Sequence, residues 1–248
     1  MFTLFFHRLA SPKYFYEISG RLIWWLGLLC GGVILAGLIG GLILAPTDYE
    51  QGEGYRIIFV HVPSAWMSLF IYTVMAVSGA IGLIWRIKLA HVVAICSAPI
   101  GASFTLITLL TGSLWGKPMW GAWWVWDARL TSELVLLFLY LGVIALYSAI
   151  EDKRTAARAA SLLAIVGMVN IPIIHYSVEW WNTLHQGPTV TKFDSPSIHA
   201  SMLVPLLLMA VGFKLYYLVV LLLRSRCAVL ETERNSGWVR SLLEMQRA

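Results

Sequence analysis

The chain has 248 residues, of which 59% are hydrophobic and only 12% are charged. Soluble domains carry roughly 25% charged residues, because their outer surface must be covered with polar side chains. This composition therefore excludes a soluble globular protein, and it also excludes disordered and fibrous classes. The 18 Lys and Arg residues exceed the 13 Asp and Glu residues. This excess would suit a nucleic-acid partner unless the positions of the charges explain it.

Six apolar stretches are long enough to cross a bilayer, whose hydrocarbon core needs about 20 apolar residues per helix. They run near residues 22–45, 63–85, 91–112, 131–150, 159–176 and 200–223. Backbone groups in lipid must be hydrogen-bonded within the chain, so stretches of this length should be helices. The short alternating segments of a membrane β-barrel are missing. The sequence predicts an all-α, polytopic membrane bundle of six transmembrane helices.

Basic residues concentrate at the two ends of the chain and in every second connection between the apolar stretches. They are Arg8, Lys13, Arg21, Arg86, Lys88, Lys153, Arg154, Arg158, Arg224, Arg226, Arg234, Arg240 and Arg247. The other connections hold few cations, mixed with acidic residues. Because cytoplasmic segments of membrane proteins are enriched in Lys and Arg, we expect both termini to be cytoplasmic. The topology explains the positive charge, and no nucleic-acid partner is predicted.

The same pattern divides the chain into two parts. We expect a six-span membrane domain over residues 1–224 and a cytoplasmic tail over residues 225–248.

Five of the 12 tryptophans lie together between the third and fourth apolar stretches. They are Trp115, Trp120, Trp123, Trp124 and Trp126. An interfacial belt at the headgroup level explains one or two such residues. Five, interrupted by Gly116, Pro118 and Gly121, supply more aromatic surface than anchoring requires. Because a large flat apolar ligand stacks well on such rings, we expect residues 113–130 to form a binding loop. A belt without a ligand is the alternative.

Asp127 ends the tryptophan-rich run directly before the fourth apolar stretch. Asp is a favourable N-cap, so Asp127 is expected to cap a helix that starts at Ala128. Capping is enough to explain Asp127, and it does not exclude a binding role. Arg129 follows two residues later, and its planar donor fork suits either Asp127 or a ligand carboxylate.

Two histidines flank the tryptophan-rich run along the chain and lie on the same predicted side of the membrane. His61 precedes Pro63, which can occupy the first turn of the second helix. His185 lies in a turn-forming segment between the fifth and sixth stretches. His175 and His199 lie near the same face and are more simply read as interfacial or hydrogen-bonded residues.

Imidazoles on both faces of a planar macrocycle are a standard way to hold haem iron. His61 and His185 are therefore candidate axial ligands of a non-covalent haem b, whose apolar body would lie against the tryptophans. Its propionates would require cations, and the cations on that side include Arg56, Lys117 and Arg129.

The sequence lacks the motifs of several other cofactor-binding and catalytic chemistries. No Cys-x-x-Cys-His attaches haem covalently, and no glycine-rich phosphate loop binds ATP. An energy-coupling step would therefore require another subunit. No nucleophile or acid–base pair is evident, so the residues give no support for a classical enzyme.

The run WGKPMWGAWWVWDARLTSE resembles the tryptophan-rich "WWD" signature of the haem-handling proteins of bacterial cytochrome c maturation. The resemblance is to the CcmC branch, the haem exporter protein C family, and it covers essentially the whole chain. It implies that His61, in VHVPSAW, and His185, in LHQGPT, match the family's two essential outer histidines. The five tryptophans and Asp127 match its signature.

The resemblance also implies a cellular role. Proteins of that family hold haem at the periplasmic face of the bacterial inner membrane and promote its covalent attachment to the haem chaperone CcmE. They work with the small membrane protein CcmD and with the transporter subunits CcmA and CcmB.

Two alternatives stay open on the sequence alone. A transporter that moves haem or another solute through its own bundle would usually carry ionisable groups at mid-membrane, and the expected spans are nearly charge-free. A b-type redox cytochrome usually has its histidines within the spans, whereas the candidate ligands here are expected outside them.

Overall fold

The computed structural model describes residues 11–181, 183–185, 187, 190 and 195–245, and across them the chain is helical, with no strand. The helices are α2 (Pro12–Leu38), α3 (Ile58–Trp85), α4 (Lys88–Trp120), α5 (Ala128–Ala149), α6 (Lys153–Gly167), α7 (Asn170–Trp180), α8 (Ala200–Thr232) and α9 (Gly237–Met245). A π-helical turn, Ile39–Leu44, continues α2, and a 3₁₀ turn, Glu53–Ile57, leads into α3.

Within the described ranges, six helical segments are long and apolar enough to cross a membrane, and one of them joins α6 to α7. The predicted all-α polytopic class is therefore confirmed. Most of the segments are longer than the apolar stretches that predicted them. The third is the clearest case, because it was expected to end near residue 112 and continues to Trp120. Hydropathy marks only the lipid-facing part of a helix, whereas the helix itself continues into the polar interface.

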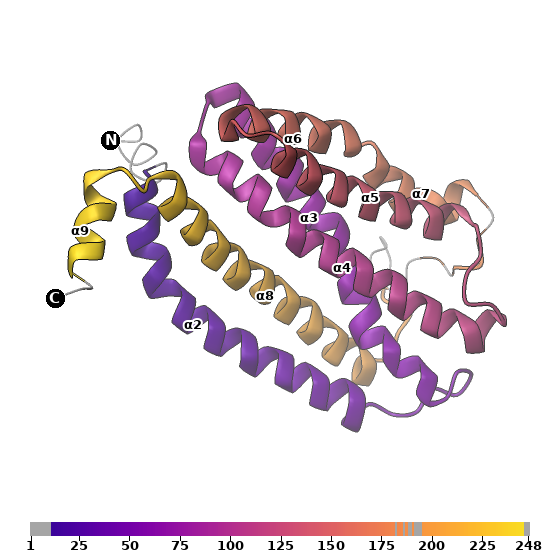
Figure 1. Cartoon of the computed structure of the whole chain (residues 1–248). Coiled ribbons are helices and arrows are strands. Elements are labelled where there is room, and N and C mark those ends of the chain that lie inside the picture. The colour runs from indigo at the N-terminus through magenta and orange to yellow at the C-terminus, as the bar shows by residue number, and fades with distance from the viewer. Residues whose placement is uncertain (1–10, 182, 186, 188–189, 191–194, 246–248) are drawn as a thin grey trace.

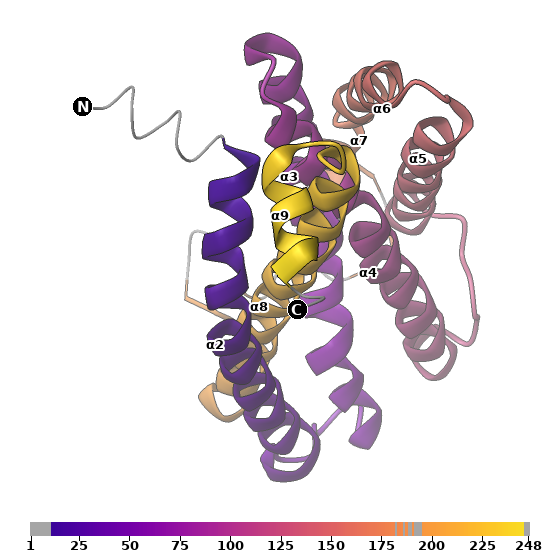
Figure 2. The same cartoon turned by 60° about the vertical axis from the view of Figure 1, so that its left-hand side comes forward.

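The helices associate in three neighbouring pairs (Figures 1 and 2). In one outer pair α2 runs along α8, and in the central pair α3 runs along α4. The third pair is α5 with the α6–α7 segment. Because α3 also contacts α6 and α8, the central pair joins the two outer ones.

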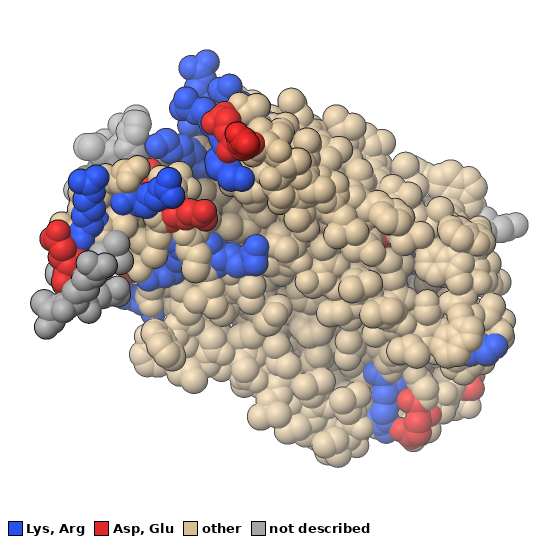
Figure 3. Space-filling view, viewed as in Figure 1, with Lys and Arg blue, Asp and Glu red and all other residues tan. Residues whose placement is uncertain are grey.

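The two ends of the bundle differ in charge. The start of α2, the α3–α4 turn, the α5–α6 turn and α9 lie at one end, and most of the Lys and Arg side chains visible in Figure 3 gather there. The opposite end carries few charged side chains in this view. This distribution agrees with the predicted topology, and the cytoplasmic assignment of the termini stays a prediction. Of the cations used for it, Arg8 and Arg247 lie outside the described residues.

The C-terminal part of the chain contacts the start of the first span. α8 continues without a break past residue 224, and α9 then places the Trp238 ring 5.7 Å from the ring of Tyr16. Arg226 lies over the same tyrosine ring at 3.7 Å. The expected boundary between a membrane domain and a tail therefore falls inside a helix, and the division itself stays a prediction.

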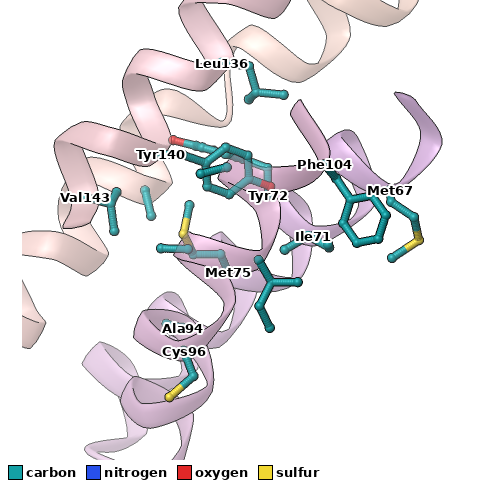
Figure 4. Close-up of a cluster of buried hydrophobic side chains, with 14 of the residues drawn as sticks. Met67, Ile71, Tyr72, Met75, Ala94, Cys96, Phe104, Leu136, Tyr140 and Val143 are labelled. Atoms are coloured by element: carbon teal, nitrogen blue, oxygen red, sulfur yellow. The ribbon is translucent and has the colours of Figure 1, made fainter. Parts of the chain in front are cut away.

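The main core lies between α3, α4 and α5 (Figure 4). The rings of Tyr72 and Tyr140 meet edge to face at 5.0 Å, and both side chains are fully buried. The Tyr140 hydroxyl donates a hydrogen bond of 2.7 Å to the carbonyl oxygen of Ser68. Gly101 on α4 makes room for this ring, because a β-carbon at that position would overlap it. The glycine thus lets α4 and α5 approach closely at mid-bundle.

Replacing Gly101 with Ala should lower the free energy of unfolding by about 1–3 kcal/mol, since the added methyl group overpacks the core against Tyr140. Gly27→Ala on α2 is the matched control, because nothing lies within 4 Å of its added β-carbon. Thermal melting of the two variants in detergent checks this expectation. Equal melting temperatures for both variants would contradict the packing account.

Candidate functional site

A cavity of about 700 Å³ lies at the end of the bundle opposite the basic end, between α3, α4, α5, α7 and the segment that follows α7. Its volume is within the range of roughly 300–1,000 Å³ that is typical of ligand pockets. Most of the predicted site residues lie in its wall. They are His61, His185, Trp115, Trp120, Trp124 and Arg129.

The tryptophan-rich segment is only partly a loop. α4 continues through Trp120 and ends at Gly121, whose φ of +75° allows the left-handed turn and whose N–H bonds to the Lys117 carbonyl oxygen. The expectation of a loop over residues 113–130 is therefore wrong for its first part. The non-helical link spans only residues 121–127, so Trp115 and Trp120 project from a rigid helix.

His61 also lies on a helix. α3 begins at Ile58, directly after the 3₁₀ turn, so Pro63 is inside the helix and the expectation that it occupies the first turn is wrong. The His61 ring is 9% exposed and meets the Trp115 indole edge to face at 5.6 Å. Gly112 on α4 leaves room for it, because a β-carbon there would lie 3.1 Å from Cε1 of His61.

The hydrogen bonds of His61 indicate its tautomer. Nδ1 lies 2.9 Å from the hydroxyl oxygen of Thr111 on α4. The single hydroxyl proton of Thr111 is directed to the carbonyl oxygen of Ile107 at 2.6 Å. With its proton on that carbonyl, Thr111 accepts from His61, and this arrangement has the imidazole proton on Nδ1. Nε2 keeps a free lone pair, the arrangement found in histidines that ligate metals.

His185 faces a carboxylate instead of a hydroxyl. Its ring packs on the Trp120 indole with a centroid distance of 4.9 Å. Nδ1 lies 3.8 Å from Oδ2 of Asp127, which is beyond hydrogen-bond length. Both atoms are buried, and neither has another hydrogen-bond partner among the described residues. A small rotation of the ring would close this contact and leave Nε2 of His185 free, as in His61.

Asp127 contacts two elements at once. Its Oδ1 accepts a hydrogen bond of 2.8 Å from the backbone N–H of Leu130, so the predicted N-cap of α5 is confirmed. Burial raises the pKa of the Asp127 carboxyl, but His185 and the backbone N–H of Leu130 lower it by more, so the pKa lies below its usual value. Asp127 is therefore an anion at neutral pH, and its second oxygen faces His185.

The five tryptophans divide into two groups. Trp115 and Trp120 are half-buried in the cavity wall, and Trp115 donates a hydrogen bond of 2.9 Å to the side chain of Gln51. Trp124 also lines the cavity, and its buried Nε1 has no hydrogen-bond partner within the described part of the chain. Trp123 and Trp126 are 56% and 75% exposed, which suits the interfacial belt.

The three candidate cations also have different surroundings. Arg56 pairs with Glu53 and donates to the carbonyl oxygen of Gly41 at 2.8 Å, so its guanidinium joins two backbone turns. Lys117 donates to the carbonyl oxygen of Gly121 at the end of α4. Among these three, the cavity wall includes only Arg129.

Sequence reasoning missed the importance of Glu133. It lies in the cavity wall on α5, is 5% exposed, and its Oε1 has no hydrogen-bond partner among the described residues. In the sequence it appeared only as an acidic residue near the end of a span. The available signal was its spacing from Arg129, since residues four apart share a helix face.

These groups fit a planar apolar ligand that carries a metal ion and acidic substituents. The imidazoles of His61 and His185 each direct Nδ1 to an oxygen, which leaves Nε2 available to ligate a metal. The indole rings form flat parts of the cavity wall. The unpartnered Nε1 of Trp124 and the guanidinium of Arg129 supply donors for acidic groups.

The chain is similar to known proteins over almost its whole length. A family model described as heme exporter protein C matches residues 5–240. The heme exporter protein C of Escherichia coli K12 is 53% identical over 237 residues, which cover 96% of this chain and 96% of the relative. The protein of the same name from Haemophilus influenzae is 49% identical over 238 residues, 96% of this chain and 97% of the relative. That of Paracoccus denitrificans is 41% identical over 221 residues, with 89% and 91% covered.

Two substitutions separate the roles of Asp127. Asp127→Ala removes the cap of α5 and should lower the free energy of unfolding by about 1 kcal/mol, whereas Asp127→Asn keeps a capping oxygen and should stay near wild type. Thermal melting of the ligand-free protein checks this difference. An Asn variant that melts as early as the Ala variant would show that capping is not what Asp127 contributes to stability.

Proposed function

Because the chain belongs to the haem exporter protein C family, whose members handle haem for cytochrome c maturation, we propose that it binds haem b without a covalent bond in this cavity. It presents the haem for covalent attachment to the chaperone CcmE. One observation carries the proposal: His61 and His185 lie in the wall of one cavity, and each directs Nδ1 towards an oxygen.

In this proposal His61 and His185 are the axial ligands. Thr111 holds the His61 ring, and Asp127 lies 3.8 Å from Nδ1 of His185, so a small rotation of that ring is enough to pair the two groups. A partner at Nδ1 fixes the ring and makes the ligating nitrogen more basic. Bound haem supplies an iron to be ligated and an unsaturated edge to be attached to the chaperone.

Trp115, Trp120 and Trp124 cover the flat faces of the ligand and exclude water from them. The Nε1 of Trp124 donates a hydrogen bond to a polar group of the ligand, which would satisfy a donor that is otherwise buried without a partner. Trp123 and Trp126 lie at the membrane interface near the mouth of the cavity, where lipid headgroups and the chaperone meet the chain.

Arg129 binds a propionate. A guanidinium offers two parallel donors to a carboxylate, and in a partly dry cavity this pair is stronger than in water. Arg56 does not take part directly, because its donors already hold Glu53 and the Gly41 carbonyl oxygen. It supports the 3₁₀ turn that leads into α3 instead.

The location and partners follow from the same proposal. The protein spans the bacterial inner membrane with both termini in the cytoplasm, so the cavity opens on the periplasmic side. It works with CcmD and with the transporter subunits CcmA and CcmB, since this chain carries no ATP-binding loop. The support for this orientation is the gathering of cations at the opposite end of the bundle (Figure 3).

Substitution of the two histidines tests the ligand assignment. His61→Ala and His185→Ala should each abolish the absorption spectrum of six-coordinate haem and weaken haem binding by at least about tenfold, because each removes one of two iron ligands. His91→Ala is the control, since His91 bonds to Ser161 near the basic end of the bundle. Haem titration of each purified variant checks this. A double variant with wild-type spectrum and affinity would overturn the assignment.

The tryptophans give a separate test. Trp124→Ala should weaken haem binding by roughly tenfold, because an aromatic contact and a buried donor are both lost. Trp126→Ala should stay within about twofold, because an exposed belt residue supplies mainly anchoring. The same titration, followed by loading of the chaperone, measures both variants. Equal effects of the two substitutions would indicate that Trp124, like Trp126, only anchors the chain at the membrane interface.

A further inference from the structure

Glu133 is a buried carboxyl group to which the proposed function assigns no task. It lies on α5, is 5% exposed and lines the cavity, with its carboxyl group against the Ser68 hydroxyl of α3. Ser68 directs its own proton to the carbonyl oxygen of Ala65 at 2.8 Å. Oε1 of Glu133 has no hydrogen-bond partner among the residues that the structure describes.

A buried carboxylate is stable only when it is paired, because the attraction of a partner must offset its loss of hydration. Arg129 lies four residues before Glu133 on the same helix, so the two side chains share the face of α5 that lines the cavity. Their charged groups form no ion pair within 4 Å in the described part of the chain.

Arg129 has a second acidic neighbour, Asp127. Asp127 already uses one oxygen for the cap of α5 and directs the other to His185. Glu133 is therefore the acidic neighbour whose carboxyl group is left to pair with Arg129 in the cavity wall.

We propose that Glu133 is a positioning residue: when the ligand is bound, its carboxylate pairs with the Arg129 guanidinium in the cavity wall, so that the outer donors of Arg129 bind an acidic substituent of the ligand. Guanidinium has five N–H donors in a planar fork, which is enough to bind Glu133 on one edge and a ligand carboxylate on the other.

This inference rests on the proposed function, because it takes the ligand to be haem and the acidic substituents to be its propionates. It adds that recognition of the propionate requires Glu133, which does not itself touch the propionate. The direct way to separate this role from a general contribution to stability is to remove the charges from the ligand.

The experiment measures the affinity of the purified full-length chain for haem and for haem dimethyl ester, in which both propionates are uncharged. Glu133→Gln, which keeps the size of the side chain, should weaken haem binding about tenfold, because an oriented charge-assisted pair is lost. Its affinity for the dimethyl ester should stay within about twofold of wild type, since that ligand has no carboxylate for Arg129. Glu151→Gln, on the exposed α5–α6 turn, is the matched control.

Two further variants complete the test. Arg129→Gln should lose affinity for haem as Glu133→Gln does, and the double variant should be no weaker than Arg129→Gln alone, because both act on one contact. Glu133→Asp keeps the charge and should restore most of the affinity for haem.

Each other result overturns the inference. Equal weakening of both ligands by Glu133→Gln would show a general structural role, and additive losses in the double variant would show that Glu133 acts independently of Arg129. An Asp variant as weak as the Gln variant would show that the charge is not what acts. If wild-type protein binds neither ligand, the proposed function fails as well, whereas wild-type binding with an unaffected Gln variant removes this inference alone.

Discussion

An ionised side chain is stable within a bilayer only where protein groups or water replace its hydration. In this chain most cations therefore lie at one end of the bundle, where α9 and the α3–α4 and α5–α6 turns are found (Figure 3). Arg129 and Glu133 are exceptions, because both lie within the first two turns of a spanning helix. Both line the same cavity. A ligand in this cavity would therefore lie next to both charged side chains.

The polar groups of the cavity wall form two sets: those that have a hydrogen-bond partner and those that have none among the described residues. His61 has its partner in Thr111, and Trp115 has its partner in Gln51. The second set consists of buried polar atoms without hydrogen-bond partners among the described residues. They are Nε1 of Trp124 and Oε1 of Glu133. Such atoms are uncommon in native proteins, and two of them in one cavity wall indicate a wall that is completed by a ligand.

Much of the fold was predictable because lipid imposes strong rules on sequence. Apolar length gave the six spans, and the preference of Asp for helix N-termini placed the start of α5. The grouping of His61 and His185 with the tryptophans of residues 115–126 was expected from their shared side of the membrane and from a family resemblance. The structure brings both histidines and three of those tryptophans into one wall.

What the sequence did not reveal depends on contacts between distant segments. The extension of α4 to Trp120 depends on a left-handed turn at Gly121, and the position of Pro63 depends on a 3₁₀ turn that hydropathy cannot detect. Arg56 was a reasonable candidate cation until its bond to the carbonyl oxygen of Gly41 became visible. The burial of Glu133 depends on how α5 packs against its neighbours in the bundle, whereas the sequence shows only that Glu133 shares a helix face with Arg129.

The central claim is that the imidazoles of His61 and His185 ligate one iron. Electron paramagnetic resonance of the wild-type chain loaded with ferric haem tests this most directly, because the signal reports the spin state and the axial ligands together. The account predicts a low-spin ferric signal of the kind given by two nitrogen ligands. A high-spin signal at neutral pH, which indicates an iron with a missing or weak axial ligand, would contradict it.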